Sequence, residues 1–345
     1  MRSLSRCAST ADVDRGRCLT LRARHPPCLQ ILHEDNELLV TAKPPDLRAH
    51  PIHRFQGGSM LNRAAGHAHR TAPGSPVPAV VHRLDQDTSG VMMFVKDRRL
   101  AGGIAEQFAR KTVAKEYLAL CVGTPAAVHF TVDAPIARHP VHAPARMLAL
   151  GGKSARTRCS VVAYRPPSGN RPGAALMRAA PETGRTHQIR LHLAAGGVPI
   201  ALDPFYFDAQ LLQAACGPHC VWPLHMTRQA LHAASLAVTH PVNGQRMRFE
   251  APLPADMVAL ASCLGVFDPD TGAVPTDGSV LTSSDDEAAL VAALGGRQTA
   301  ELDFEQGNCV PIRYRDDPGE GVTAVELSGG EEDEDDEDAP ANALI

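Results

Sequence analysis

Residues 82–90 read HRLDQDTSG, and the apolar run VMMFV (91–95) follows at once. Five apolar residues in a row predict a buried strand, and the Thr-Ser-Gly step before them predicts a turn. Asp85 and Asp87 in such a turn often serve only the turn. The arginine beside them, next to a buried strand, nevertheless raises the question of whether they carry chemistry.

Two chemical interpretations of these acids are open. A metal pair is disfavoured, because no third carboxylate clusters with them, and His187 and His192 are five residues apart, the wrong spacing for one helical face. A carboxylate nucleophile must be ionised and oriented, which requires a nearby arginine that lowers its pKa. The candidates for that arginine are Arg83 and Arg185.

The composition indicates a globular protein. Of the 345 residues, 44% are hydrophobic, which is enough for a sizeable core. The nine cysteines are scattered and no secretory signal precedes them, so we expect an intracellular, reduced protein. No apolar run approaches the roughly 18 residues of a membrane span, so we expect no membrane association.

Charge divides the chain into two parts. Residues 1–260 carry 31 Lys and Arg against 17 Asp and Glu, a net charge of +14, whereas residues 261–345 carry 21 acids and three arginines. A basic body suits a polyanionic partner such as a nucleic acid, although solubility alone could also explain it.

Other patterns predict the elements around the opening motif. In VAKEYLALCVG (113–123), the period of two places Lys115 and Tyr117 on one strand face, where they can serve a site. In TGRTHQIRLHLAAGG (183–197), Thr186 can cap a helix that buries Ile189 and puts Arg185 at its positive end. Further predictions are a strand at 38–42, a helix at 102–111, and hairpins at 157–180 and 230–254, the last with an Asn-Gly turn.

The two ends differ from the middle of the chain. Residues 1–28 hold six arginines, which fits a mitochondrial transit peptide or a plain disordered extension. We expect a catalytic domain at 29–258 and an acidic, largely disordered extension at 259–345 with one short helix in SSDDEAALVAALGG, capped by Ser284. Without an import signal, the cytoplasm or the nucleus would be the compartment.

The opening motif resembles the HRLDxxTSG signature of the RluA-type family of RNA pseudouridine synthases. Further segments agree in the order that the family uses, and the resemblance covers roughly residues 30–257. These segments are EDNELLVTAKP (34–44), FARKTVAKEYLALCVG (108–123), GKSART (152–157), GRTHQIRLHL (184–193) and LHAASLAVTHP (231–241) followed by FEAPLP.

The resemblance implies an α+β fold on a mainly antiparallel mixed sheet, with the active cleft between two halves. It implies isomerisation of uridine to pseudouridine in structured RNA, ribosomal or transfer. The target base must leave its stack to be reached. We expect RNA as the partner, no cofactor, no metal and a monomer. The alternatives are an inactive RNA-binding protein on this scaffold and a glycosidase that releases the base.

The resemblance also implies roles for single residues. Asp85 is the nucleophile, Tyr117 a proton acceptor, and Arg185 the partner of the aspartate. Arg83 fills the place of the extruded base, and Ile189 packs against that base. We expect three more motif residues and the strand lysine to contact substrate: His82, Thr88, Arg190 and Lys115.

Three features depart from the family pattern or stand outside it. Asp46 and Leu202 occupy positions where relatives usually have glycine, the latter before Asp203. Neither belongs to the implied catalytic set, so we expect them to alter substrate fit more than chemistry. The segment CGPHC (216–220), with His225 nearby, lacks ordinary zinc spacing and is interpreted as an inserted loop.

Overall fold

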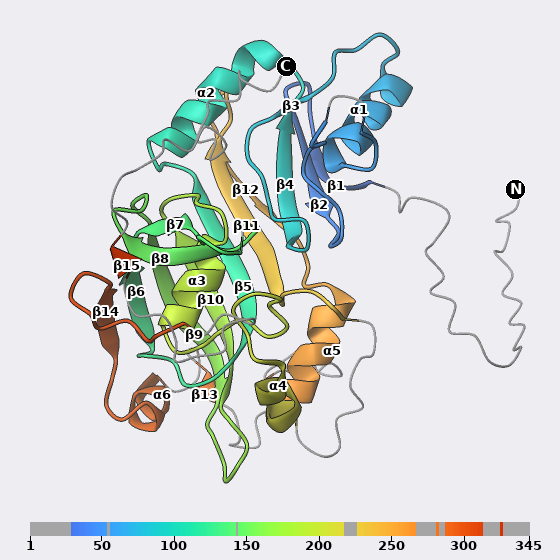
Figure 1. Ribbon diagram of the computed structural model, residues 1–345. Helices are drawn as coiled ribbons and strands as arrows, with labels where there is room; N and C mark the ends of the chain where they lie inside the picture. The colour runs from blue at the N-terminus through green and yellow to red at the C-terminus, as the bar shows by residue number, and fades with distance from the viewer. Residues whose placement is uncertain are drawn as a thin grey trace, which may run out of the picture.

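The structure, a computed structural model, describes residues 29–53, 56–142, 144–216, 226–266, 281–282, 287–312 and 325–326. Twelve of its strands form one mixed sheet, around which the described helices pack (Figure 1). The strands of this sheet are β1 (Gln30–Glu34), β2 (Leu38–Lys43), β3 (Ala79–Val80), β4 (Ser89–Val95), β5 (Ala114–Val122), β6 (His129–Asp133), β9 (Arg156–Arg165), β10 (Ala174–Pro181), β11 (Leu231–Thr239), β12 (Arg246–Glu250), β13 (Leu281–Thr282) and β14 (Thr299–Asp303).

The remaining elements form a small second sheet and six helices in the described part of the chain. The second sheet consists of β7 (Ile136–Arg138), β8 (Arg146–Leu150) and β15 (Val325–Glu326). The helices are α1 (Met60–Thr71), α2 (Arg98–Ala109), α3 (Gln188–Ala195), α4 (Ala209–Cys216), α5 (Ala255–Leu264) and α6 (Glu287–Ala293). None of these helices is long and apolar enough to cross a bilayer.

The large sheet joins two halves with separate cores. Its order is β1-β2-β4-β11-β5-β10-β9-β6-β14, with antiparallel neighbours except at β4–β11 and β6–β14. In the first half, one core lies between the β2 and β4 strands and α2, and a second lies between the same strands and α1. The larger core of the other half lies among β5, β10, β9 and helices α3 to α5. The α+β fold and the two halves implied by the resemblance are therefore confirmed.

The opening motif leads into the junction of these halves. All seven residues of β4 are buried, as the apolar run predicts. This strand pairs in parallel with β11 only at two positions, where Ser89 lies opposite His232 and Gly90 opposite Ala233. The Ser89 hydroxyl donates to Nδ1 of His232 at 2.9 Å, because the other ring nitrogen donates to the Ala251 carbonyl.

Gly90 is required at this crossing, so we predict that Gly90→Ala is strongly destabilising. Its φ is +118°, and a Cβ atom there would collide with the carbonyl group of Ala233. We expect a loss of about 3 kcal/mol in the free energy of unfolding, measured with urea. The control is Gly103→Ala on α2, where a Cβ meets nothing within 4 Å and should stabilise the helix by about 0.5–1 kcal/mol. Equal stabilities would contradict this explanation.

Most predicted elements are present. The strand at 38–42, the helix at 102–111, and both hairpins correspond to β2, α2, β9–β10 and β11–β12. The prediction of capping by Thr186 is wrong. Helix α3 begins at Gln188 after His187, which has a left-handed φ of 61° and makes no side-chain capping bond. All eight residues of α3 are buried, so it is a core helix.

The described part of the expected C-terminal extension adds structure to the body of the protein. The boundary expected at residue 259 falls inside α5, and residues 287–312 pack on the body as α6 and β14. Strand β14 adds a parallel edge to β6, and the Val310 amide donates to the Ala195 carbonyl at the end of α3. Residues 1–28 and 331–338 lie outside the described residues, as do Ser284, His225 and most of CGPHC.

Candidate active site

A cavity of about 690 Å³ lies where the two halves meet. Its walls come from the loop before β4, from α2, from β5 and from the start of α3. Every candidate site residue predicted from the sequence lines it: His82, Arg83, Asp85, Thr88, Lys115, Tyr117, Arg185, Ile189 and Arg190. The fold therefore brings together residues that are more than 100 positions apart in the sequence.

The loop that carries Asp85 is held through its backbone. The Thr88 amide donates to the Asp85 carbonyl at 3.1 Å and closes the turn. Lys43 Nζ, which is buried, donates to the Gln86 carbonyl at 2.6 Å, and Arg228 donates to the Asp87 carbonyl at 3.1 Å. The Lys43 amine and the Arg228 guanidinium thus donate to consecutive carbonyls of the turn, which fixes where the Asp85 side chain points.

Arg190 is the arginine that contacts Asp85. Its Nη1 lies 3.4 Å from Oδ2 of Asp85, whose side chain is 25% exposed toward the cavity. The guanidinium is held by Asp203 in a bidentate pair, with distances of 2.6 and 2.8 Å, and both of those side chains are buried. The other carboxylate oxygen of Asp85 makes no hydrogen bond to a described residue, so it is available for chemistry.

This geometry corrects the pairing expected for Arg185. Although Arg185 lines the cavity, its Nε donates to the carbonyl of Ser154 at 3.2 Å. Arg190, expected only to bind substrate, takes the place beside Asp85. The physical reason is the late start of α3, because the first helical turn directs Arg190, and not the residue five positions earlier, toward the loop.

Asp85 is ionised at neutral pH. Burial alone would raise the pKa of its carboxyl, but His187, Arg190 and Arg83 more than offset burial and lower it. His187 is itself neutral at pH 7, since burial and the neighbouring Arg190 lower its pKa to about 4. The permanent charges that favour the ionised form of Asp85 at pH 7 are therefore those of Arg190 and Arg83, of which Arg190 contacts the carboxylate.

Tyr117 and Lys115, both on β5, line the cavity, as the strand period predicts. Burial and the charge of Asp85 raise the pKa of Tyr117, so the phenol is protonated at neutral pH and can donate a hydrogen bond. Burial and then Lys111 lower the pKa of Lys115 to about 8, and its Nζ donates to the Thr183 carbonyl at 3.1 Å. The expected role of Tyr117 as a proton acceptor stays a prediction.

The other predicted substrate contacts also line the cavity. Arg83 is exposed, whereas Ile189 and Thr88 are buried in the wall. His82 stacks on Phe108, and its Nε2 accepts a hydrogen bond from the Met93 amide at 2.9 Å. Burial lowers the pKa of His82 to about 4, so this ring is a neutral structural part of the wall at pH 7.

Sequence reasoning missed four residues that support Asp85. Lys43 and Arg228 were not singled out, because only the fold shows which carbonyls they reach. His187 was considered only as a metal ligand, yet it accompanies Asp85 in the cavity and its ring contacts the Tyr206 hydroxyl at 2.8 Å. Asp203 had a signal, since it follows a position that departs from the family pattern.

Both departures lie closer to the catalytic loop than expected. Asp46 and Leu202 have left-handed φ values of 56° and 63°, which explains why glycine suits these positions. Asp46 accepts a hydrogen bond from the Gln86 side chain at 3.2 Å, and Leu202 precedes the Asp203 that holds Arg190. Both positions therefore adjoin residues that hold the catalytic loop or Arg190 in place, although neither contact involves Asp85, Tyr117 or Arg185.

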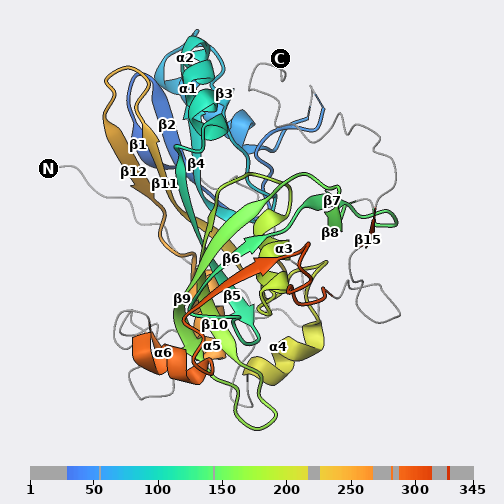
Figure 2. The same ribbon diagram turned by 90° about the vertical axis from the view of Figure 1, so that its left-hand side faces the viewer.

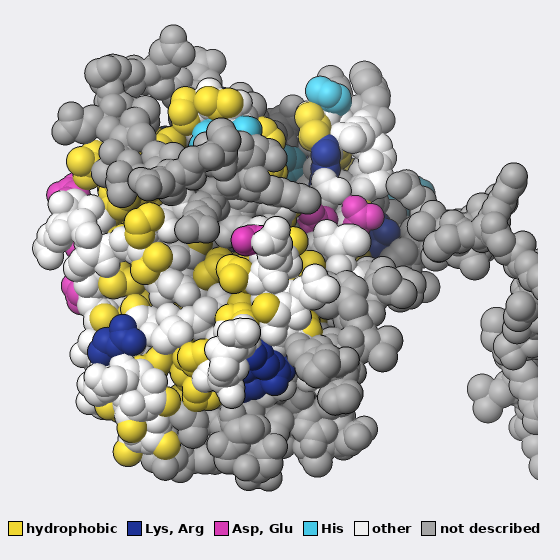
Figure 3. Space-filling view, turned by 60° about the horizontal axis from the view of Figure 1, so that its bottom comes forward, with side chains coloured by type: hydrophobic (Ala, Val, Ile, Leu, Met, Phe, Trp, Pro, Cys, Tyr) yellow, Lys and Arg dark blue, Asp and Glu magenta, His cyan; other side chains and the backbone are white. Residues whose placement is uncertain are grey.

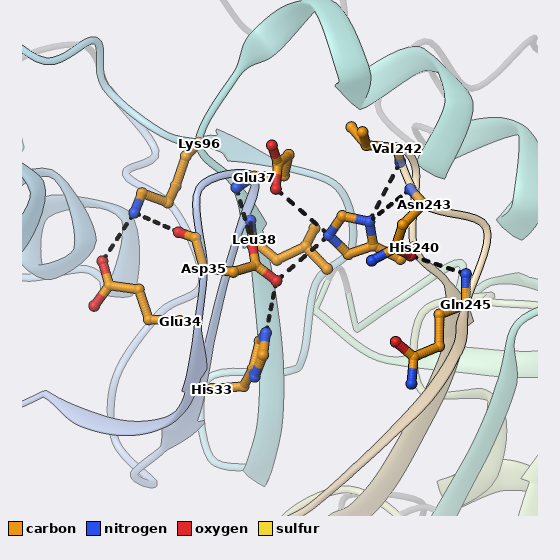
Figure 4. Close-up of polar contacts among 10 residues, drawn as sticks. All are labelled: His33, Glu34, Asp35, Glu37, Leu38, Lys96, His240, Val242, Asn243 and Gln245. Atoms are coloured by element: carbon orange, nitrogen blue, oxygen red, sulfur yellow. Dashed lines mark hydrogen bonds and ion pairs between the residues drawn. The ribbon is translucent and has the colours of Figure 1, made fainter.

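One cluster in the described residues has metal-like composition: Asp35, Glu37 and His240 (Figure 4). His240 Nδ1 accepts hydrogen bonds from the Val242 and Asn243 amides, both at 3.3 Å. The proton therefore resides on Nε2, which points at the two carboxylates at 3.4 and 3.6 Å. Asp35 also accepts from two amides and from His33, so the donors present already satisfy the cluster, which ties the β1–β2 turn to the β11–β12 hairpin.

We predict that Asp35→Asn lowers stability in a pH-dependent way. Burial would raise the pKa of Asp35, but the His33 contact and the amides of Leu38 and Glu37 lower it. A depressed carboxyl pKa stabilises the fold above the unfolded value near 3.9 and loses that contribution as the pH falls. We expect a loss on the order of 1 kcal/mol at neutral pH and almost none near pH 3, by urea unfolding. Glu250→Gln, on an exposed side chain, is the control, and an equal loss at both pH values would contradict the prediction.

Basic side chains concentrate at the cavity. Arg83, Lys111, Lys115, Arg185 and Arg190 all line it. The described side chains on the face formed by α4, α5 and α6, at the lower end of Figure 1, show Lys and Arg only in small separate patches (Figure 3). The cavity side is therefore the better place for a polyanion.

Known proteins match this chain over the same region. Residues 37–195 match the family model described as RNA pseudouridylate synthase. Ribosomal large subunit pseudouridine synthase D of Nitrosomonas europaea is 38% identical over 240 residues, which cover 68% of this chain and 65% of that enzyme. The enzyme of the same name from Pseudomonas aeruginosa is 35% identical over 238 residues, covering 68% of this chain and 72% of that enzyme.

A solved structure agrees with these relatives. Human RNA pseudouridylate synthase domain containing 4 superposes with a TM-score of 0.53 at 25% identity, and the match covers 68% of this chain and 92% of that one. The sequence matches and the shared fold, together with an ionised Asp85 in the signature loop, lead to one assignment. The chain belongs to the RluA-type family of RNA pseudouridine synthases, enzymes that isomerise uridine to pseudouridine in RNA.

Proposed function

We propose that this protein converts particular uridines of structured ribosomal RNA to pseudouridine, with Asp85 as the nucleophile, and that it acts as a monomer. The relatives named above modify the large ribosomal subunit by their names, which favours ribosomal over transfer RNA. The observation that carries the proposal is the Asp85 carboxylate, ionised beside Arg190, with one oxygen directed into a basic cavity.

In this proposal the target base leaves the RNA stack and enters the cavity. Arg83 is exposed at the mouth, where a flat cation can take the place of the base near phosphates. Ile189 supplies an apolar surface against which the flipped base can pack. The free Asp85 oxygen then attacks C1′ of the target nucleotide, and the N-glycosidic bond to N1 of uracil breaks. The retained uracil rotates and bonds to C1′ through its C5 atom, the bond between C1′ and Asp85 breaks and restores the carboxylate, and the uracil loses the C5 proton while N1 gains a proton. The neutral Tyr117 phenol stands ready to exchange a proton in that rearrangement.

The test is to incubate the protein with ribosomal and transfer RNA transcripts and to map pseudouridine at nucleotide resolution. We expect conversion in ribosomal RNA with unchanged RNA mass, because an isomerase neither adds nor removes atoms. Release of free uracil would identify a glycosidase instead. Binding of RNA without any conversion on either substrate class would favour the inactive RNA-binding protein.

A further inference from the structure

The ring of His187 is packed against two aromatic side chains at the cavity. It stacks on Phe205, with the ring centroids 5.7 Å apart and the planes at 27°, and it meets the Tyr206 ring edge-on, also at 5.7 Å. Arg190 lies over the same two rings, with its Cζ 5.5 Å from the Phe205 centroid and 5.2 Å from the Tyr206 centroid. One aromatic pair therefore supports both His187 and the guanidinium that contacts Asp85.

The backbone of His187 holds this ring at the junction of the two halves. The residue has a left-handed φ of 61°, and α3 begins at the next position. A non-glycine residue keeps such a conformation only where the surrounding structure enforces it, which is common at active sites. Figure 2 shows α3 below α1 and α2 and above α4. Burial raises the pKa of Asp85, and His187 is the first of the side chains that lower it, so the imidazole lies close to the carboxylate.

One ring nitrogen of His187 is engaged by the protein, and the other is not. Nδ1 contacts the Tyr206 hydroxyl at 2.8 Å. Nε2 makes no hydrogen bond to any described residue, although the side chain is only partly exposed and lines the cavity. Burial and then Arg190 lower the pKa of His187 to about 4, so at pH 7 the neutral ring has one donor and one acceptor nitrogen. Nε2 is therefore a polar atom that a substrate group can bind.

The substrate places a hydroxyl beside the carbon that Asp85 attacks. In a uridine the uracil lies on the β face of the ribose, so a carboxylate that displaces it at C1′ approaches from the α face. The 2′-hydroxyl lies on that α face, on the carbon next to C1′. A side chain beside the attacking oxygen therefore faces the 2′-hydroxyl, the group that distinguishes RNA from DNA. A hydroxyl both donates and accepts, so it can pair with Nε2 in either tautomer of the ring.

We propose that Nε2 of His187 forms a hydrogen bond with the 2′-hydroxyl of the target uridine and thereby selects ribose over deoxyribose. The same contact holds C1′ against the free oxygen of Asp85. Arg190 then orients the nucleophile, whereas His187 orients the carbon that the nucleophile attacks. The inference rests on the proposed function, since the attack of Asp85 on C1′ sets the position of the ribose.

The first experiment compares a substrate RNA with the same RNA that carries 2′-deoxyuridine at the target position. For each protein, the single-turnover rate with the first RNA is divided by the rate with the second, which gives a 2′-hydroxyl ratio. Loss of fold or of general RNA binding affects both RNAs alike and cancels in this ratio. We expect the ratio of the wild type to exceed those of His187→Phe and His187→Asn by about tenfold. Phenylalanine keeps the aromatic packing without the nitrogens, and asparagine tolerates a left-handed backbone but is too short to reach the ribose.

Lys111→Gln is the matched control, because Lys111 is an exposed residue that lines the same cavity. Loss of its charge should weaken the binding of both RNAs equally and leave the 2′-hydroxyl ratio at the wild-type value. Equal ratios in the wild type and both His187 variants would overturn the inference. An equal decrease of the ratio in Lys111→Gln would also overturn it.

The second experiment measures affinity and needs no turnover. In proteins that carry Asp85→Asn, fluorescence anisotropy compares the binding of the two RNAs. We expect a preference for the ribose form of about threefold or more, which His187→Asn abolishes. This preference decides the inference where a His187 variant is too slow to assay, and its absence would overturn the inference there. If the wild type converts no RNA, the proposed function fails and the inference fails with it, whereas conversion with an unchanged ratio overturns the inference alone.

Discussion

Asp85→Asn is expected to reduce pseudouridine formation by at least about 10³-fold while the protein keeps its fold and its affinity for RNA. The amide has nearly the same shape as the carboxylate but cannot attack carbon as a nucleophile. Its Oδ1 can still face Nη1 of Arg190, so the cavity should stay intact. Single-turnover kinetics on a substrate RNA measure the rate, and anisotropy measures the affinity.

Asp87→Asn is the matched control for this variant. Asp87 lies two residues further in the same turn, and burial and the nearby Asp46 raise its pKa. Its backbone carbonyl, which the substitution keeps, is the atom that Arg228 grips. We expect Asp87→Asn to lower the rate less than about tenfold. Full activity of Asp85→Asn would overturn the assignment of the nucleophile, and an equal loss in both variants would point to the loop and not to the carboxylate.

The second large effect is expected from Arg190, which we regard as a positioning residue. Arg190→Lys keeps the charge but loses the planar fork that binds Asp203 at two points and Asp85 at a third. We expect the maximal rate to fall by about 10- to 100-fold, with little change in RNA affinity, because the carboxylate is less well oriented. Weaker RNA binding with an unchanged maximal rate would contradict this role.

The pH dependence of the rate tests whether Arg190 acts on Asp85 or only stabilises the fold. In the wild type the lowered pKa of Asp85 keeps it ionised from neutral pH down to below its ordinary range, so the rate should be flat there. Removing the charge raises that pKa, and the rate should then begin to fall at a higher pH. The double variant Arg190→Gln with Asp203→Asn tests this without leaving a buried carboxylate unpaired.

Arg185→Gln is the comparison for this series, because Arg185 lines the same cavity. Loss of a positive charge at the cavity should weaken RNA binding. Because the guanidinium contacts the Ser154 carbonyl and not Asp85, the pH at which the rate begins to fall should not change. If Arg185→Gln raised the pH at which the rate begins to fall and the double variant did not, Arg185 would be the partner of Asp85. Thermal unfolding of each variant shows whether any loss of rate comes from loss of the fold.

The sequence alone predicted which residues form the active site better than it predicted how those residues contact one another. The run HRLDQDTSG with VMMFV predicted a turn with charged side chains before a buried strand. The period of two in residues 113–123 placed Lys115 and Tyr117 on one strand face, which lines the cavity. These features are local, because a side chain's face depends only on its position along a strand. The family signature then joined distant segments, and the cavity contains all of the residues that it implied.

Position within the site depended on the tertiary structure. Arg185 and Arg190 occur in one short segment, and the start of α3 after the left-handed His187 decides which of them faces Asp85. The hydrogen bond from Lys43 Nζ to the Gln86 carbonyl could not be predicted either, since the position of a lysine in a strand does not indicate which carbonyl its side chain contacts. Such contacts span many residues and form only when separate strands pair.

The C-terminal region shows the same division. The local pattern of SSDDEAALVAALGG, which begins with a capping serine, predicted a short helix, and α6 lies in that segment. The strands β14 and β15 were missed, since each has too few apolar residues to predict a strand and exists by adding to an edge of β6 or β8. Periodicity and motifs depend only on neighbouring residues, so the sequence alone determines them. Edge pairing, left-handed turns and buried ion pairs depend on segments that are distant in the sequence, so only the tertiary structure determines them.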